Sequence, residues 1–177
     1  TVAGREADEG PVHEVELTHP LIVRTTEITQ AEWFALAGNN PSANVGCRDC
    51  PVDSVNWYEA AWFANALSEK RGFPKCYDLE GCKSRPGEGL QCEHGVFLGV
   101  SCTGYRLPSE AEWEFMARDG GKSDRPKNLA ASAWFSPRSE GRTRPVGMAT
   151  PSALGLRNLY GNVWEWVGDV HSEKYYE

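Results

Sequence analysis

Six cysteines are the residues of this chain whose type and spacing point most directly to chemistry: Cys47, Cys50, Cys76, Cys82, Cys92 and Cys102. An even set of cysteines in Gly- and Pro-rich loops is typical of a disulfide framework. Two other uses stay open. The Cys-x-x-Cys spacing at residues 47–50 also suits a zinc knuckle or a redox pair. However, the remaining spacings are not those of a standard zinc site, and the motif does not follow the strand of a βαβ unit.

Among the possible disulfide pairings we prefer a local bridge and two nested ones. The local bridge is Cys47–Cys50, and Cys76–Cys102 encloses Cys82–Cys92 across a hairpin. Such bridges form in oxidising compartments, so the cysteines predict a secreted, periplasmic or cell-surface protein. The first residues are polar and no initiator Met precedes them, which favours a mature or trimmed chain without a signal peptide in this sequence.

Three capping motifs predict three short helices that would position these loops. The motifs are Thr29 with Glu32 before a helix over about 30–37, Asn56 with Glu59 before a helix ending near Gly72, and Ser109 with Glu112 before a helix ending near Arg118. Partial alternation of apolar residues predicts two strands within 11–28, and further strands at 75–79 and 95–100. The elements do not alternate as βαβ units, so we expect one α+β domain over residues 1–177 with many loops.

Charge and hydropathy exclude two classes of partner. The net charge of -7 argues against nucleic acid, because phosphate binding needs clustered Lys and Arg. No apolar run approaches the roughly 20 residues that cross a membrane, so we expect no transmembrane segment. The four histidines are scattered and suggest no metal enzyme.

Two segments carry a family resemblance. GYRLPSEAEWEF (104–115) and GNVWEW (161–166) resemble signatures of the formylglycine-generating-enzyme, or sulfatase-modifying-factor, family, and residues 51–68 are a weaker match. The resemblance covers residues 9–170. It implies an irregular, loop-rich formylglycine-generating-enzyme / C-type-lectin-like fold. Within the first segment we expect Arg106 to pair with Glu114.

The same resemblance implies a structural calcium ion. Its ligands would be Asn158, Gly161, Val163 and Glu165, and such amide, carbonyl and carboxylate oxygens are the hard ligands that Ca²⁺ prefers. The alternative is that Asn158 and Glu165 only accept hydrogen bonds from backbone N–H groups of the loop. The family's catalytic members also hold copper through two cysteines near their C-terminus, and none of the six cysteines here aligns with those ligands. Copper would therefore need ligands from a C-terminal segment missing from this sequence.

The function predicted from these observations is a secreted or surface module that binds a ligand or serves a structural role. A protein or peptide is the expected ligand. The alternative is a fragment of a formylglycine-generating oxidase, which converts a protein cysteine to formylglycine with copper and O₂. Its catalytic cysteines would then lie beyond residue 177, in a C-terminal portion of the family fold that this chain lacks. Because those cysteines are not in the sequence, the residues present leave enzyme activity undecided.

Overall fold

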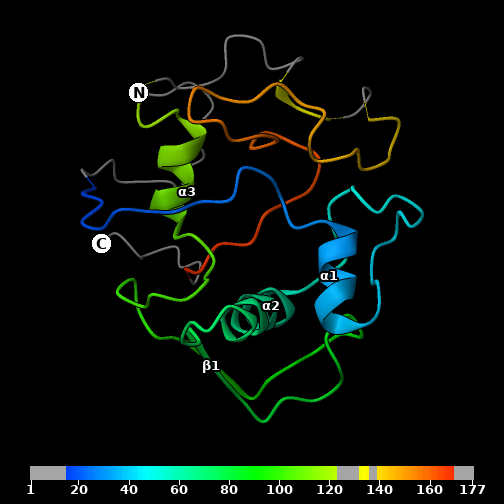
Figure 1. Ribbon diagram of the computed structural model, residues 1–177, viewed down its shortest axis with the longest axis vertical. Helices are drawn as coiled ribbons and strands as arrows, with labels where there is room; N and C mark the ends of the chain where they lie inside the picture. Colours follow the sequence, from blue (N-terminus) through cyan, green and yellow to red (C-terminus); the bar gives the residue numbers. More distant parts are fainter. Residues whose placement is uncertain (1–14, 123–131, 136–138, 170–177) are drawn as a thin grey trace, which may run out of the picture.

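Three helices and one hairpin are joined by long loops in the computed structural model, which describes residues 15–122, 132–135 and 139–169 (Figure 1). The helices are α1 (Gln30–Ala37), α2 (Trp57–Lys70) and α3 (Glu110–Ala117). Strands β1 (Tyr77–Glu80) and β2 (His94–Phe97) pair antiparallel, with Tyr77 opposite Phe97. Helix α2 lies in the middle, with α1 beside it and the hairpin below it in the view of Figure 1. The predicted loop-rich α+β class is confirmed.

All three helices begin at the predicted capping motifs. In each one the N-cap side chain accepts a hydrogen bond from the backbone N–H three residues later, and the Glu at that position accepts one from the N-cap backbone. These reciprocal bonds satisfy N–H groups that have no partner inside the helix. Gly38 ends α1 in the left-handed conformation, with φ of 76°.

The strands agree with the prediction in one region and not in the other. Strands β1 and β2 lie at the two predicted segments, shifted by a few residues. The prediction of two strands in 11–28 is wrong for residues 15–28, which contain no strand, and residues 11–14 lie outside the described part of the chain. The apolar alternation there does not mark a buried face, because Ile22 is fully exposed. The segment instead meets the rest of the fold at its end, where Val52 N donates to Ile28 O at 2.9 Å.

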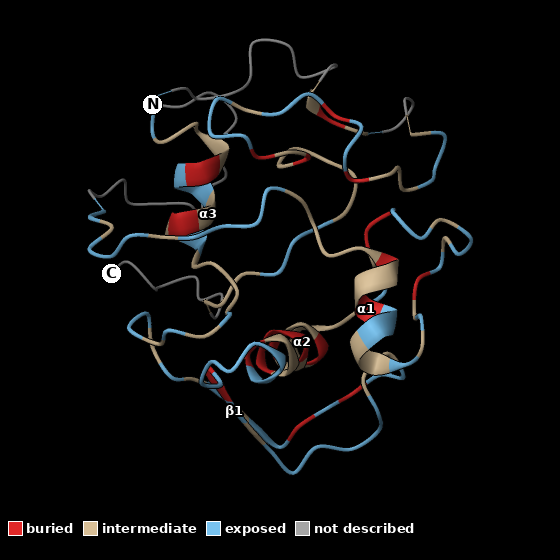
Figure 2. Cartoon of the chain, in the orientation of Figure 1, coloured by how far each residue is buried: buried red, intermediate tan, exposed pale blue. Residues whose placement is uncertain are grey.

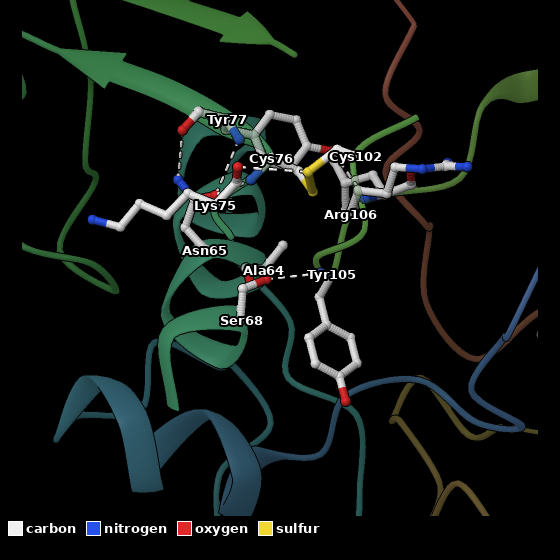
Figure 3. Close-up of a disulfide and its surroundings, with 10 residues drawn as sticks. Ala64, Asn65, Ser68, Lys75, Cys76, Tyr77, Cys102, Tyr105 and Arg106 are labelled. Carbon is white, nitrogen blue, oxygen red and sulfur yellow. Dashed lines mark hydrogen bonds between the residues drawn. A yellow bond between two sulfur atoms is a disulfide. The ribbon is translucent and has the colours of Figure 1, made fainter. Parts of the chain in front are cut away.

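Three disulfides join the six cysteines in the preferred pairs, Cys47–Cys50, Cys76–Cys102 and Cys82–Cys92. Figure 3 shows how the second bridge is tied to α2. The side chain of Asn65 accepts from Cys76 N at 3.0 Å and from Tyr77 N at 3.1 Å, and Ser68 Oγ accepts from Tyr105 N at 2.7 Å. The chain on both sides of the bridge is therefore fixed to one helix.

The loop closed by Cys82–Cys92 is held from inside by a buried carboxylate. Glu59 of α2 is only 1% exposed, and its Oε1 accepts from the backbone N–H groups of Gly87, Gly89 and Leu90 at 2.8–3.1 Å. Its Oε2 completes the cap of α2 by accepting from Asn56 N. The Glu59 side chain thus caps the central helix and also binds the loop between Cys82 and Cys92. Buried residues lie along α2 (Figure 2). None of the helices in the described ranges has the length and apolarity to cross a bilayer.

Arg106 pairs with a different residue from the one predicted. Its guanidinium donates to both carboxylate oxygens of Glu112 at 2.6 and 2.7 Å, while Glu114 pairs with Arg118 at 3.1 Å. Glu112 is at the third position of α3 and faces back toward its N-terminus. Glu114 lies about 200° further around the helix, on the exposed side. The Arg106–Glu112 pair is 11% and 7% exposed, so it joins the extended chain before α3 to the helix in a mostly dry setting.

This pair predicts a stability difference that depends on pH. The hydrogen bonds from Arg106 lower the pKa of Glu112 below its ordinary value of 4.5, against an opposing effect of burial. Its stabilisation is therefore complete above that value and is lost as the pH falls through the pKa of the folded state. We expect Glu112→Gln to lower the free energy of unfolding at pH 7 by about 1.5–3 kcal/mol, and the two proteins to converge as the pH falls below the folded-state pKa of Glu112. Urea denaturation at several pH values measures this.

The matched control is Glu114→Gln, which removes an exposed pair and should cost less than about 1 kcal/mol. Equal losses at pH 7 in the two variants would contradict the assignment of the pair to Glu112.

Candidate functional site

Residues 161–169 cross the middle of the molecule and contact segments from all over the sequence (Figure 1). Three hydrogen bonds join them to the starts of α2 and α3. Trp57 Nε1 donates to Val167 O at 3.0 Å, and Trp166 Nε1 donates to Val55 O at 3.0 Å. Gly168 N donates to Pro108 O at 2.8 Å. The GNVWEW segment therefore lies where the three segments with the family resemblance meet.

The loop that leads into this segment is tightly coiled. Gly161 N donates to Asn158 O at 3.0 Å, and Val163 N donates to Gly161 O at 3.0 Å. Asn158 and Asn162 adopt left-handed backbone conformations, with φ of 63° and 72°, which Asn tolerates better than most residues. Three of the four predicted metal ligands, Asn158, Gly161 and Val163, are thus close together along one coil.

The side-chain amide of Asn158 has an unusual hydrogen-bond pattern. The residue is 2% exposed, and its Nδ2 donates to Glu27 Oε2 at 2.8 Å and to Val146 O at 3.0 Å. Its Oδ1 is buried and has no hydrogen-bond partner. A buried acceptor without a partner costs about 1–3 kcal/mol. Since both Nδ2 hydrogens are in use, rotating the amide would lose two bonds, so Asn158 presents a free oxygen to the site.

Glu27 is a site residue that the sequence reasoning missed. It lies in the chain before α1, yet its carboxylate accepts from Asn158 Nδ2 and, at 2.9 Å, from Asn162 Nδ2. Loss of hydration around this half-buried group raises its pKa, while the two amides lower it. No local pattern indicated a contact across 131 residues.

Glu165 brings a second carboxylate to this region. Its Oε2 accepts from Trp113 Nε1 at 2.5 Å. Loss of hydration raises the pKa of Glu165 to about 7; the Trp113 bond lowers it, and the charge of nearby Glu27 raises it. Glu165 is also exposed at the loop surface, so water screens part of these interactions.

The described residues place no positive side chain against these two carboxylates. Neither Glu27 nor Glu165 is paired with Lys or Arg in the part of the chain that the structure covers. That part also contains no group of three or more His, Cys, Asp or Glu that could hold a metal. The site instead combines two carboxylates with a free amide oxygen and loop carbonyls. Such a set of hard oxygen atoms could hold a divalent cation.

The alternative, in which Asn158 and Glu165 only accept hydrogen bonds from backbone N–H groups of the loop, does not match these contacts. Its Oδ1 accepts from no N–H group, and its Nδ2 bonds are made to acceptors. Glu165 accepts from an indole rather than from the loop backbone. The six cysteines lie elsewhere and are all in disulfides, so none is a free thiol for zinc or redox chemistry in this structure.

A family model described as the sulfatase-modifying factor enzyme 1-like domain matches residues 1–177. The chaperone protein LppX from Paenibacillus barcinonensis is 32% identical over 171 residues, which cover 82% of this chain and 61% of that protein. A formylglycine-generating enzyme from Streptomyces coelicolor is 30% identical over 206 residues, covering 98% and 65%. One from Mycobacterium tuberculosis is 40% identical over 144 residues, covering 72% and 48%. The chain thus spans less than two thirds of the length of these relatives.

Solved structures share the fold. Treponema denticola variable protein 1 superimposes with a TM-score of 0.67 at 29% identity, covering 82% of this chain and 61% of that one. PvdO from Pseudomonas aeruginosa gives a TM-score of 0.66 at 25% identity, covering 97% and 65%. These matches confirm the fold that the GYRLPSEAEWEF and GNVWEW segments imply.

The close packing of the loop predicts that one glycine cannot be replaced. A Cβ on Gly161 would lie 2.2 Å from the carbonyl oxygen of Trp134, and the neighbouring Asn162 N already donates to that oxygen at 2.7 Å. The backbone must move to admit a methyl group, so we expect Gly161→Ala to lower the free energy of unfolding by about 1–3 kcal/mol. Gly147→Ala is the control, because a Cβ there meets nothing within 4 Å. Equal melting temperatures for the two variants would contradict the packing described.

Proposed function

Because the chain belongs to the family of sulfatase-modifying factor enzyme 1-like domains, we propose that it is an extracytoplasmic binding or structural module organised by calcium. The observation that carries the calcium part of this proposal is the free Oδ1 of Asn158, buried beside a carboxylate that has no cationic partner among the described residues. The proposal of a binding rather than an oxidising role is supported by the cysteines. All six are joined to one another, so none is free to hold copper.

The residues present fit a calcium ion chemically. The amide oxygen of Asn158, the carbonyls of Gly161 and Val163 and the carboxylate of Glu165 would hold it, and Glu27 adds a second negative charge nearby. When bound, the ion supplies the positive charge that two neighbouring carboxylates lack. The chain's own part is to fix the coil at 158–163 through its internal hydrogen bonds.

The proposed location follows from the disulfides. Three bridges close loops in a domain whose core consists mainly of one central helix and a short hairpin. Disulfides of this kind form and persist in oxidising compartments. The periplasm, the cell surface and the extracellular space all meet that condition, and a protein or peptide is the proposed ligand class.

Chelation tests the calcium site. We expect EGTA to lower the melting temperature, because a cation at 100 times its dissociation constant stabilises the folded state by about 2.7 kcal/mol. For a chain of this length that corresponds to roughly 5–10 °C. Glu165→Gln should remove most of the difference, whereas Glu88→Gln, which removes an exposed pair with Arg85, should keep it. Equal melting temperatures of the unchanged protein in calcium and in EGTA would overturn the calcium site.

A second candidate function is supported by the relatives named formylglycine-generating enzyme, which are 30–40% identical to this chain. In that case the chain is the scaffold part of an oxidase, and the copper ligands come from residues outside this sequence. The full-length protein, loaded with copper and supplied with a thiol reductant, would then consume O₂ in the presence of a Cys-x-Pro-x-Arg peptide and convert its cysteine to formylglycine. The cysteine would supply two of the four electrons that reduce O₂ to water, and the reductant the other two. The binding-module proposal predicts no peptide-dependent O₂ consumption. Such consumption, with the product confirmed by mass spectrometry, would replace that proposal with the oxidase.

A further inference from the structure

Glu27 has a position in the structure that suggests a role in metal binding. We propose that it is the positioning residue of the calcium site. It fixes the amide of Asn158 with the oxygen toward the cation, and so makes metal binding depend on the docking of residues 25–28. This inference rests on the calcium site proposed above and adds a residue far from it in the sequence. Glu27 acts through Asn158 and Asn162.

The contacts of Asn158 select one orientation of its amide. An Asn side chain has two N–H donors at one end and an acceptor oxygen at the other. Asn158 uses both donors, one on Glu27 Oε2 at 2.8 Å and one on Val146 O at 3.0 Å. These two acceptors select the orientation in which Oδ1 is left free for a cation. Without Glu27, a single bond to Val146 would remain to hold the amide.

Glu27 is itself held in place by Asn162. Its Oε1 accepts from Asn162 Nδ2 at 2.9 Å, and Asn162 is fixed from its other side by the backbone of Arg144. Arg144 N donates to Asn162 Oδ1 at 2.8 Å, and Asn162 Nδ2 donates to Arg144 O at 3.1 Å. The carboxylate is therefore clamped between two oriented amides. Partners that orient a ligand in this way are typical of metal sites.

The contacts of residue 27 require a carboxylate. Both of its oxygens face NH₂ groups, and a carboxylate is an acceptor at both positions. A Gln would present its own NH₂ group to one of the two amides, where donor would meet donor. It would also remove a negative charge that lies close enough to Glu165 to affect its carboxylate. A neutral residue of the same shape therefore fails for two physical reasons.

The neighbours of Glu27 extend the link to the fold. Arg157 N donates to Thr25 O at 2.9 Å, and Val52 N donates to Ile28 O at 2.9 Å. Residues 25–28 thus lie between the loop at 157–163, which carries three of the proposed calcium ligands, and the chain that leads to α2. Docking this segment delivers Glu27 to the site, and a cation bound at the site stabilises the docked segment in return.

The test measures cation affinity directly. Terbium, a luminescent substitute for calcium, is titrated into the protein and then displaced with calcium. Trp113 is the expected sensitiser, because its indole nitrogen lies 2.5 Å from Glu165 Oε2. Calorimetric titration with calcium gives the same affinity without a probe. The variants are Glu27→Gln, Glu27→Asp and the control Ser68→Ala, which removes a buried hydrogen bond to Tyr105 N at the opposite end of α2 from Trp57.

We expect Glu27→Gln to weaken calcium binding by about 10–100-fold. Glu27→Asp keeps the charge but is too short to reach both amides, so its affinity should be intermediate. Ser68→Ala should melt at a lower temperature and keep the unchanged protein's affinity. Should Glu27→Gln fail to fold, the Asp variant carries the comparison.

Three results would overturn the inference, and they differ in meaning. If the unchanged protein binds calcium and the Glu27 variants bind it equally well, Glu27 does not position the site, while the calcium proposal stands. If the unchanged protein binds neither terbium nor calcium, the calcium proposal fails and this inference fails with it. A loss of affinity in Ser68→Ala as large as in Glu27→Gln would show a general effect of destabilisation and would also overturn the role of Glu27.

Discussion

Negative charge without a positive partner is the constraint around which the loops near Glu27 and Glu165 are arranged. Glu27 and Glu165 are near neighbours, no Lys or Arg of the described residues pairs with either, and the buried Oδ1 of Asn158 accepts no hydrogen bond. Charges and polar groups removed from water are costly unless they are paired. A divalent cation would satisfy all three groups at once, whereas a single water molecule could supply hydrogen bonds but not the missing charge.

The same region explains how a domain with little regular structure keeps one conformation. Residues 161–169 are hydrogen-bonded to the starts of α2 and α3, and Asn158, in the loop before them, is hydrogen-bonded to Glu27 in the chain in front of α1. On the other side of α2, the order comes from the three disulfides and from the buried carboxylate of Glu59. Covalent bridges and polar clamps thus contribute much of the order that a larger sheet would give in other folds.

The sequence predicted what depends on local signals. The three helix starts follow from capping motifs within four residues of chain, and the disulfide pairs follow from nesting within one hairpin. It failed where the outcome depends on the helical phase or on distant contacts. Arg106 pairs with the carboxylate that faces back along α3, and the alternating residues of 15–28 have no neighbouring strand. Glu27 went unnoticed because its partners lie more than 130 residues away.

A crystal structure of the protein grown in calcium tests the central claim most directly. The account predicts an anomalous scattering peak at about 2.3–2.6 Å from Asn158 Oδ1 and from the Glu165 carboxylate, with Glu27 still bound to the Asn158 amide. The contradicting result is a structure without such a peak, in which Asn158 Oδ1 accepts a hydrogen bond from water or from the protein.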